Sequence, residues 1–284
     1  MTPRRLSGWR LVILLVSLGG EGLALSAAVT MAGVLAFSLL QRDEESARFA
    51  AWSAASSLGI VIALLPGTYW SVRSLLGKSE TPVFVMPRLW RIAWITLPLG
   101  LILGWLSFRQ DSLPLVLTLA PFAHLLTSLS AVVLLLALVS RGGPQVPWRR
   151  MAAALTSGLT ATPLMAIVAE VGVLLPLVVG AGVILMTLPE GPALARSLLE
   201  SGGDPSTLDP AAMAGWLAHP AVVASVFAFI AGIVPCLEEI AKSAAVWRFL
   251  RRGLSASEAF LFGAIAGAGY GLFESLFLSQ PGAD

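Results

Sequence analysis

The chain has 284 residues, of which 57% are hydrophobic and only 12% are charged, and its mean hydropathy is +0.85. A soluble domain carries about a quarter charged residues, so the composition excludes that class and indicates a polytopic membrane protein. The formal net charge is +2, and the 18 Lys and Arg residues are spread in small groups between apolar spans. Because this distribution is a topology signal, we expect the lipid bilayer, and no nucleic acid, as a partner. The single cysteine, Cys236, excludes an internal disulfide and a multi-cysteine metal site.

The N-terminal segment has features of a secretory signal peptide, because arginines precede the apolar run LVILLVSLGG and the small-residue stretch ALSAA. Cleavage there would leave Val29 to Leu40, which is too short to cross a bilayer. We therefore predict one long first helix from Trp9 to Leu40.

Seven apolar segments are long enough to cross a hydrocarbon core of about 30 Å at about 1.5 Å per residue. They cover approximately residues 9–40, 50–72, 90–107, 114–140, 151–187, 220–248 and 257–279. The sequence therefore predicts an all-α fold, a polytopic transmembrane helical bundle of about seven spans. The stretch PALARSLLE, between the fifth and sixth spans, predicts a short surface helix.

The basic residues alternate between the loops, and 13 of the 18 fall on one side of the predicted bundle. The positive-inside rule then places the N-terminus in the cytoplasm and the segment from Pro189 to His219 outside. The loop RGGPQVPWRR predicts a division between an N-terminal four-helix region, residues 1–145, and a region of residues 146–284 that carries a charged motif.

Ionisable groups inside predicted spans are the strongest functional signal, because each costs several kcal/mol at the bilayer centre unless it is paired, neutralised or hydrated. They are Glu21, His124, Glu170, Glu238, Glu239, Lys242 and Glu274. On a helix, Lys242 lies four residues after Glu238 and three after Glu239, so it can pair with either carboxylate. Pro235 precedes this cluster and predicts a kink that frees a backbone acceptor nearby.

The last span contains Gly263, Gly267 and Gly271, a stripe of small residues that predicts close packing against a neighbouring helix. Glu274 follows on nearly the same face. If the neighbour is the preceding helix, Glu274 points toward Glu238 and Glu239. Carboxylates that share one site have raised pKa values, as a general base for water requires.

The segments EEIAK at 238–242 and YGLFE at 270–274 resemble the EExxK and FxxxE motifs of the PrsW-type glutamic intramembrane proteases, over approximately residues 220–284. The related CAAX-processing proteases carry EExxxR and FxxxH, which fit less well because position 243 is Ser and position 274 is Glu. The resemblance implies a peptidase of the bacterial cytoplasmic membrane that cleaves a membrane-anchored protein substrate. It also implies catalytic roles for Glu238, Glu239, Glu274 and Lys242.

Two features depart from the family pattern. Tyr270 stands where the second motif has Phe. The family also places essential histidines on later helices, whereas this sequence ends ten residues after Glu274. We therefore expect residues 146–284 to lack the C-terminal helices of the protease region, and the 284-residue chain to be inactive by itself.

Other interpretations remain open at the level of sequence. The two glutamates and the nearby basic residues are also typical of an interfacial ion pair. The same cluster fits an ion- or proton-coupled transporter, or a non-catalytic membrane scaffold of the same fold. A divalent metal is undecided, because nitrogen or sulfur ligands are missing nearby. Single carboxylates, Glu21 and Glu170, predict interhelical hydrogen bonds, and we expect His124 to be a packed polar residue and His219 to lie too far away to join the site.

Overall fold

The computed structural model describes residues 8–78, 82–187, 191–200, 214–215, 217–250 and 253–277. Seven helical stretches in this part of the chain are long and apolar enough to cross a membrane, which confirms the predicted all-α polytopic architecture. They are Leu11–Gln41, Glu44–Leu75, Trp90–Ser107, Leu113–Ser140, Trp148–Thr187, Pro220–Ala244 and Ala256–Phe277. Each stretch overlaps one predicted span.

The chain folds as two compact units. The first unit comprises residues 1–163 and 242–284, and the second comprises residues 164–241. The two boundaries fall inside helices, one near the start of α6 (Ala161–Thr187) and one inside α10 (Val234–Leu250). Neither boundary lies near residue 145, and the predicted division after that residue stays a prediction.

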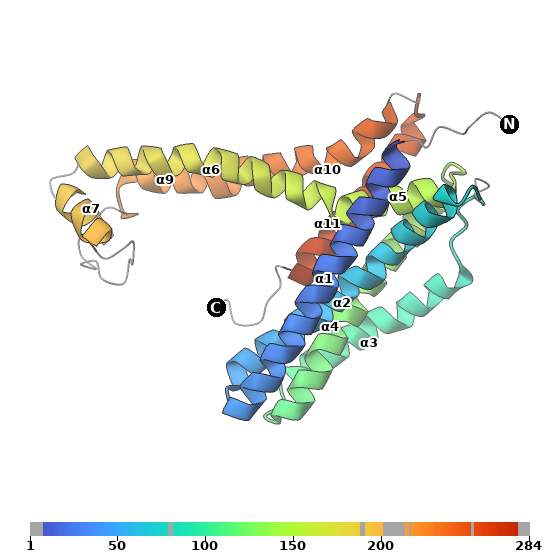
Figure 1. The fold of residues 1–284 in the computed structure, drawn as a ribbon, viewed down its shortest axis with the longest axis horizontal. Helices are drawn as coiled ribbons and strands as arrows, with labels where there is room; N and C mark the ends of the chain where they lie inside the picture. The colour runs from blue at the N-terminus through green and yellow to red at the C-terminus, as the bar shows by residue number, and fades with distance from the viewer. Residues whose placement is uncertain are drawn as a thin grey trace. The chain divides into compact units, whose positions relative to one another are not determined.

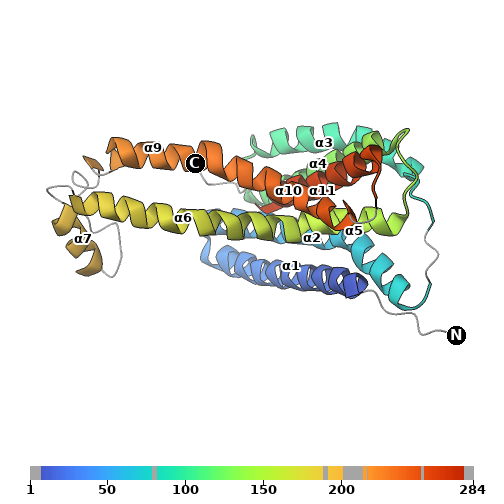
Figure 2. The same ribbon diagram turned by 90° about the horizontal axis from the view of Figure 1, so that it is seen from above.

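The first unit begins with two helical pairs. Helix α1 (Gly8–Gln41) packs along α2 (Glu44–Leu75), and α3 (Ala93–Ser107), which follows the short 3₁₀ helix η1 (Arg88–Ile92), packs along α4 (Leu113–Ser140) (Figures 1 and 2). The predicted first span is thus a single helix. Asp43 caps α2, because its side chain accepts a hydrogen bond of 3.1 Å from the Ser46 N–H.

The predicted fifth span is broken. It was expected to be one helix over 151–187, but the structure has α5 (Trp148–Leu159), then Thr160 at φ −129° and ψ −69°, then α6. The physical reason is Pro163, which has no N–H to donate to the Leu159 carbonyl and so cannot continue an α-helical ladder across this point. The expectation of one continuous helix is therefore wrong, although the whole segment remains apolar enough to span.

Helices α5 and α11 (Ala256–Phe277) form the centre of the first unit. One buried cluster consists of Val146, Met151, Ala154, Leu261, Phe262 and Ile265. A second consists of Ala24, Ile60, Leu64, Leu159, Leu272 and Leu276. Because α11 contributes to both clusters, the part of the chain that carries the YGLFE motif is held by the core of this unit.

The contact between α5 and α11 depends on two glycines. A Cβ built on Gly269 would lie 2.6 Å from the Leu155 carbonyl oxygen, and one built on Gly158 would collide with the Ala266 carbonyl oxygen. The predicted stripe behaves differently. A Cβ on Gly263 would lie 3.8 Å from Val246, and one on Gly267 or Gly271 would have no atom within 4 Å among the described residues. Close packing of α11 thus uses another face than the predicted one.

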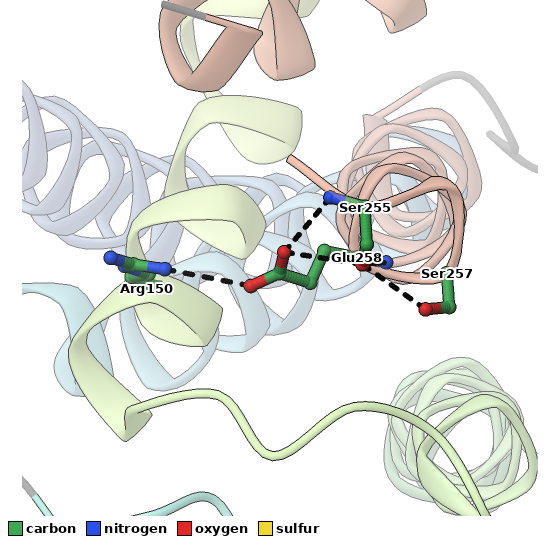
Figure 3. A network of polar contacts seen from close by, with 4 residues as sticks. All are labelled: Arg150, Ser255, Ser257 and Glu258. Atoms are coloured by element: carbon green, nitrogen blue, oxygen red, sulfur yellow. Dashed lines mark hydrogen bonds and ion pairs between the residues drawn. The ribbon is translucent and has the colours of Figure 1, made fainter. Parts of the chain in front are cut away.

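The first turns of α5 and α11 are joined by a polar network, shown in Figure 3. Arg150 Nη1 lies 3.7 Å from Glu258 Oε1. Glu258 also accepts a hydrogen bond of 3.0 Å from the Ser255 N–H, while its own N–H donates to Ser255 Oγ at 3.2 Å. This reciprocal arrangement is a capping box at the start of α11.

The second unit contains most of α6, the short helix α7 (Gly191–Glu200), α9 (Pro220–Ala228), the π-helical segment η3 (Phe229–Ile233) and the start of α10. Helix α7 confirms the predicted short helix in PALARSLLE. His219 caps α9, because its Nδ1 accepts a hydrogen bond of 3.3 Å from the Ala221 N–H. This local role agrees with the expectation that His219 takes no part in the charged motif.

Candidate functional site

The backbone is irregular directly before the charged motif. Residues Phe229–Ile233 form a π-helical segment, and α10 begins at Val234 with Pro235 in its first turn. Because Pro235 lacks an N–H, it cannot close an α-helical hydrogen bond to the carbonyl of Ala231. The irregularity that Pro235 predicts is therefore present, and it takes the form of a π turn instead of a simple kink. Such turns are rare and occur frequently at functional sites.

The EEIAK motif lies on one continuous helix, α10. Glu238 is half-buried, Glu239 is exposed, and Lys242 is half-buried. On this helix Lys242 lies one turn after both carboxylates, as the sequence predicts. The boundary between the two units falls inside the motif, with Glu238 and Glu239 in the second unit and Lys242 in the first.

Lys242 makes a contact with the second motif. Its Nζ lies over the ring of Tyr270, 4.6 Å from the ring centroid, and Tyr270 is buried in the core of the first unit. An ammonium group over an aromatic face is stabilised by the ring quadrupole, by about 2 kcal/mol when water is excluded. Tyr270, the first residue of YGLFE, therefore contacts Lys242, the last residue of EEIAK.

Glu274 lies in the last turns of α11, which are fixed by α4. On α4, Ser128 Oγ lies 2.7 Å from Ser275 Oγ, so this contact anchors the turn that carries Glu274. The His124 ring of α4 packs on Trp52, with the ring centroids 4.1 Å apart. This ring contact agrees with the interpretation of His124 as a packed polar residue.

Glu170 interacts with the EEIAK motif, and the sequence does not reveal this interaction. The carboxylates of Glu170, on α6, and Glu238, on α10, interact electrostatically within the second unit. The sequence interpretation treats Glu170 as an isolated carboxylate, because it lies far from the EEIAK motif along the chain. The available signal was weak: Glu170 is the only charged residue in its apolar span.

Glu21 has the structural role that the sequence predicts. Its Oε1 accepts a hydrogen bond of 2.7 Å from Thr68 Oγ1, which joins α1 to α2. A carboxylate with this partner serves as a matched control for the motif carboxylates. Within the described part of the chain, no group of three or more His, Cys, Asp or Glu side chains is arranged to hold a metal ion.

Within the first unit, Lys242 of EEIAK contacts Tyr270 of YGLFE. Within the second unit, Glu170 interacts electrostatically with Glu238. Comparisons of the sequence with models of protein families, with curated proteins and with solved structures found no match.

Proposed function

We propose that the chain is an intramembrane peptidase that hydrolyses a membrane-anchored protein, with Glu238, Glu239 and Glu274 as its acid and base groups. The observation that carries the proposal is the distance of 4.6 Å between Lys242 Nζ and the Tyr270 ring centroid. Lys242 ends EEIAK and Tyr270 begins YGLFE, so two motifs that resemble those of PrsW-type proteases meet at one point. Both residues lie inside candidate membrane spans, which makes a solvated ion pair at the surface a weaker explanation.

Helix geometry extends this argument to the carboxylates. Glu238 precedes Lys242 by one turn of α10, and Glu274 follows Tyr270 by one turn of α11. Consecutive spans cross the bilayer in opposite directions, so these two steps lead toward the same side of the membrane. The proposal requires both carboxylates to face one hydrated space, which the π-helical backbone before α10 favours because irregular backbone at membrane depth lines such spaces.

The proposed reaction is a water-mediated hydrolysis. One carboxylate takes a proton from water while the water oxygen attacks the scissile carbonyl carbon, and a second, protonated carboxyl group donates a hydrogen bond to the developing oxyanion. The proton taken from water then passes to the amine nitrogen as the C–N bond breaks. Lys242 stabilises the carboxylate form of the base. We place the protein in the bacterial cytoplasmic membrane with a cytoplasmic N-terminus, which 13 of 18 basic residues on one side support.

The test is cleavage of a single-pass membrane peptide by the full chain in proteoliposomes. Glu238→Gln, Glu239→Gln and Glu274→Gln each remove one carboxylate at constant size, and loss of an acid or base group lowers the rate by about 10² to 10⁴. Glu21→Gln is the control, because its partner is Thr68 and it should keep the activity. Full cleavage by all three motif variants contradicts the proposal.

A second function is favoured by one observation, the electrostatic interaction of Glu170 with Glu238. Neighbouring intramembrane carboxylates are typical of proton pathways in carriers. Proton flux into the same proteoliposomes, measured with an enclosed pH-sensitive dye, separates the two functions. Flux that is abolished by both Glu170→Gln and Glu238→Gln, without peptide cleavage, assigns the chain to a proton-coupled carrier.

A further inference from the structure

The first unit contains a pocket of about 380 Å³ at one end of its helices. Its lining includes Phe84, Trp90, Ser140, Arg141, Gln145 and Leu261. This volume falls in the range of about 300 to 1,000 Å³ that small-molecule sites occupy. We propose that this pocket binds the headgroup of an anionic phospholipid.

The position of the pocket along the membrane normal matches a lipid headgroup. The third candidate span begins at Trp90 and the fourth ends at Ser140, and both residues line the pocket. Leu261, in the second turn of α11, contributes from the start of the last span. Three spans therefore start or end at this level, which is where headgroups lie.

The chemistry of the pocket suits a phosphate group. The Arg141 guanidinium lies 4.4 Å from the centroid of the Trp90 ring, and within the described residues no carboxylate lies within ion-pair distance of it. The described segments at this end, residues 82–91 and 141–150, carry five Arg residues and no carboxylate. Glu258 at this end is engaged by Arg150 at 3.7 Å. The surface around Arg141 is thus positive, as anionic lipids require.

Two backbone N–H groups in the pocket wall can donate hydrogen bonds to a ligand. The Phe84 N–H donates to the Val146 carbonyl at 2.7 Å, and the Trp148 N–H donates to the Pro82 carbonyl at 3.1 Å. These two bonds fix the lining segments against each other. In the described part of the chain, the N–H groups of Val85 and Gln145 donate to no backbone carbonyl. They are donors that phosphate oxygens can use, as N–H groups do in other anion sites.

A lipid fits better than free phosphate because apolar side chains next to the pocket are exposed. Val85 is 71% exposed, Ile92 is 50% exposed and Leu138 is 65% exposed. Ile92 and Leu138 belong to the helical segments that continue from the pocket into the membrane. Acyl chains that hang from a headgroup in the pocket would cover these side chains, whereas inorganic phosphate would leave them uncovered.

The experiment compares lipids added to the purified full chain in a neutral detergent, with binding measured by native mass spectrometry and thermal unfolding. Phosphatidylglycerol should bind and raise the unfolding temperature, and phosphatidylcholine and inorganic phosphate should not. Arg141→Gln should weaken phosphatidylglycerol binding by about tenfold or more, because a hydrogen bond to a charged group is lost. Gln145→Glu, which places a negative charge at the pocket, should weaken it similarly.

Arg109→Gln is the matched control. Arg109 lies 4.2 Å from the centroid of the Trp105 ring, so it repeats the Arg–Trp pair at the opposite end of α3. This variant should keep full phosphatidylglycerol binding. Equal loss in Arg109→Gln and Arg141→Gln overturns the site in favour of a general charge effect, and unchanged binding in Arg141→Gln and Gln145→Glu also overturns it. Stabilisation by inorganic phosphate as strong as that by phosphatidylglycerol overturns the choice of a lipid.

Discussion

The packing of α11 on α5 can be tested by one methyl group placed at two nearby positions. Gly269→Ala adds a Cβ that lies 2.6 Å from the Leu155 carbonyl oxygen and 3.0 Å from the Leu159 backbone nitrogen. Both neighbours are backbone atoms, so the two helices must separate to accept it. Gly267→Ala adds the same methyl group to the same helix, where no described atom lies within 4 Å of it.

The two variants share every effect except the collision. Each gains about 1 kcal/mol from the higher helix propensity of Ala, so that contribution cancels in the comparison. Overpacking of a tight contact costs about 1 to 3 kcal/mol. Gly269→Ala should therefore be less stable than Gly267→Ala by about 1 to 3 kcal/mol, which corresponds to roughly 2 to 12 °C in unfolding temperature for a chain of this size.

The assay is thermal unfolding of both variants in the same detergent, followed by the loss of the monodisperse peak in size-exclusion chromatography and by circular dichroism. Equal unfolding temperatures for the two variants would refute the close approach of α11 to the Leu155 carbonyl. A larger loss in Gly267→Ala would restore the glycine stripe as the packing face of α11.

Three further predictions concern orientation, the motif contact and one helix cap. In a Cys236→Ala background, a cysteine at Gly143 should be shielded from an impermeant outside reagent and one at Gly203 should react; the reverse pattern contradicts the cytoplasmic N-terminus. Lys242→Met and Tyr270→Leu should show a coupling energy of about 0.5 to 2 kcal/mol in a double-mutant cycle of unfolding, whereas additive effects would mean that the cation–π contact is absent. The hydrogen bonds from Ser46 lower the pKa of the Asp43 carboxyl below 3.8 in the folded chain, so their contribution to stability is present above that pH and is lost as the pH falls through the folded-state value. Asp43→Asn should therefore flatten the acid dependence of Ser46 amide exchange below about pH 4, and an unchanged dependence would show that Asp43 is not the titrating cap.

The spans were predictable because long apolar runs leave a helix as the only form that satisfies every backbone group in lipid. The break at Thr160 was harder, since both sides of it are apolar and the run reads as one segment. Its cause was nevertheless visible, because Pro163 cannot donate to Leu159. A second visible sign was length: residues 151–187 as one helix measure about 55 Å, far more than a bilayer core of about 30 Å.

For the candidate site, the sequence predicts the spacing of residues along one helix but not which helices bring residues together. The spacing of Glu238 and Lys242 follows from the helical repeat alone. The proximity of Glu170 to Glu238 depends on which helices are neighbours, and apolar composition does not encode that choice. The prediction of close packing at the glycine stripe was wrong for a related reason. The stripe at 263, 267 and 271 forms a regular repeat, but the close contact uses Gly269, which is outside the repeat, and Gly158 on another helix.

The break at Thr160 also constrains the order in which the chain enters and assembles in the bilayer. Helix α6 has 27 residues, about 40 Å of helix, and can insert as a complete span, whereas α5 has 12 residues, about 18 Å, and cannot cross by itself. Helix α5 gains its burial from α2 and α11, and α11 is synthesised nearly a hundred residues later. The part of α5 that meets α11, around Leu155 and Gly158, must therefore remain without its final surroundings until α11 has been inserted. Complete burial of α5 is then a late step of biogenesis, and ribosome-bound chains that end before Ala256 should leave its α11-facing side open to labelling reagents.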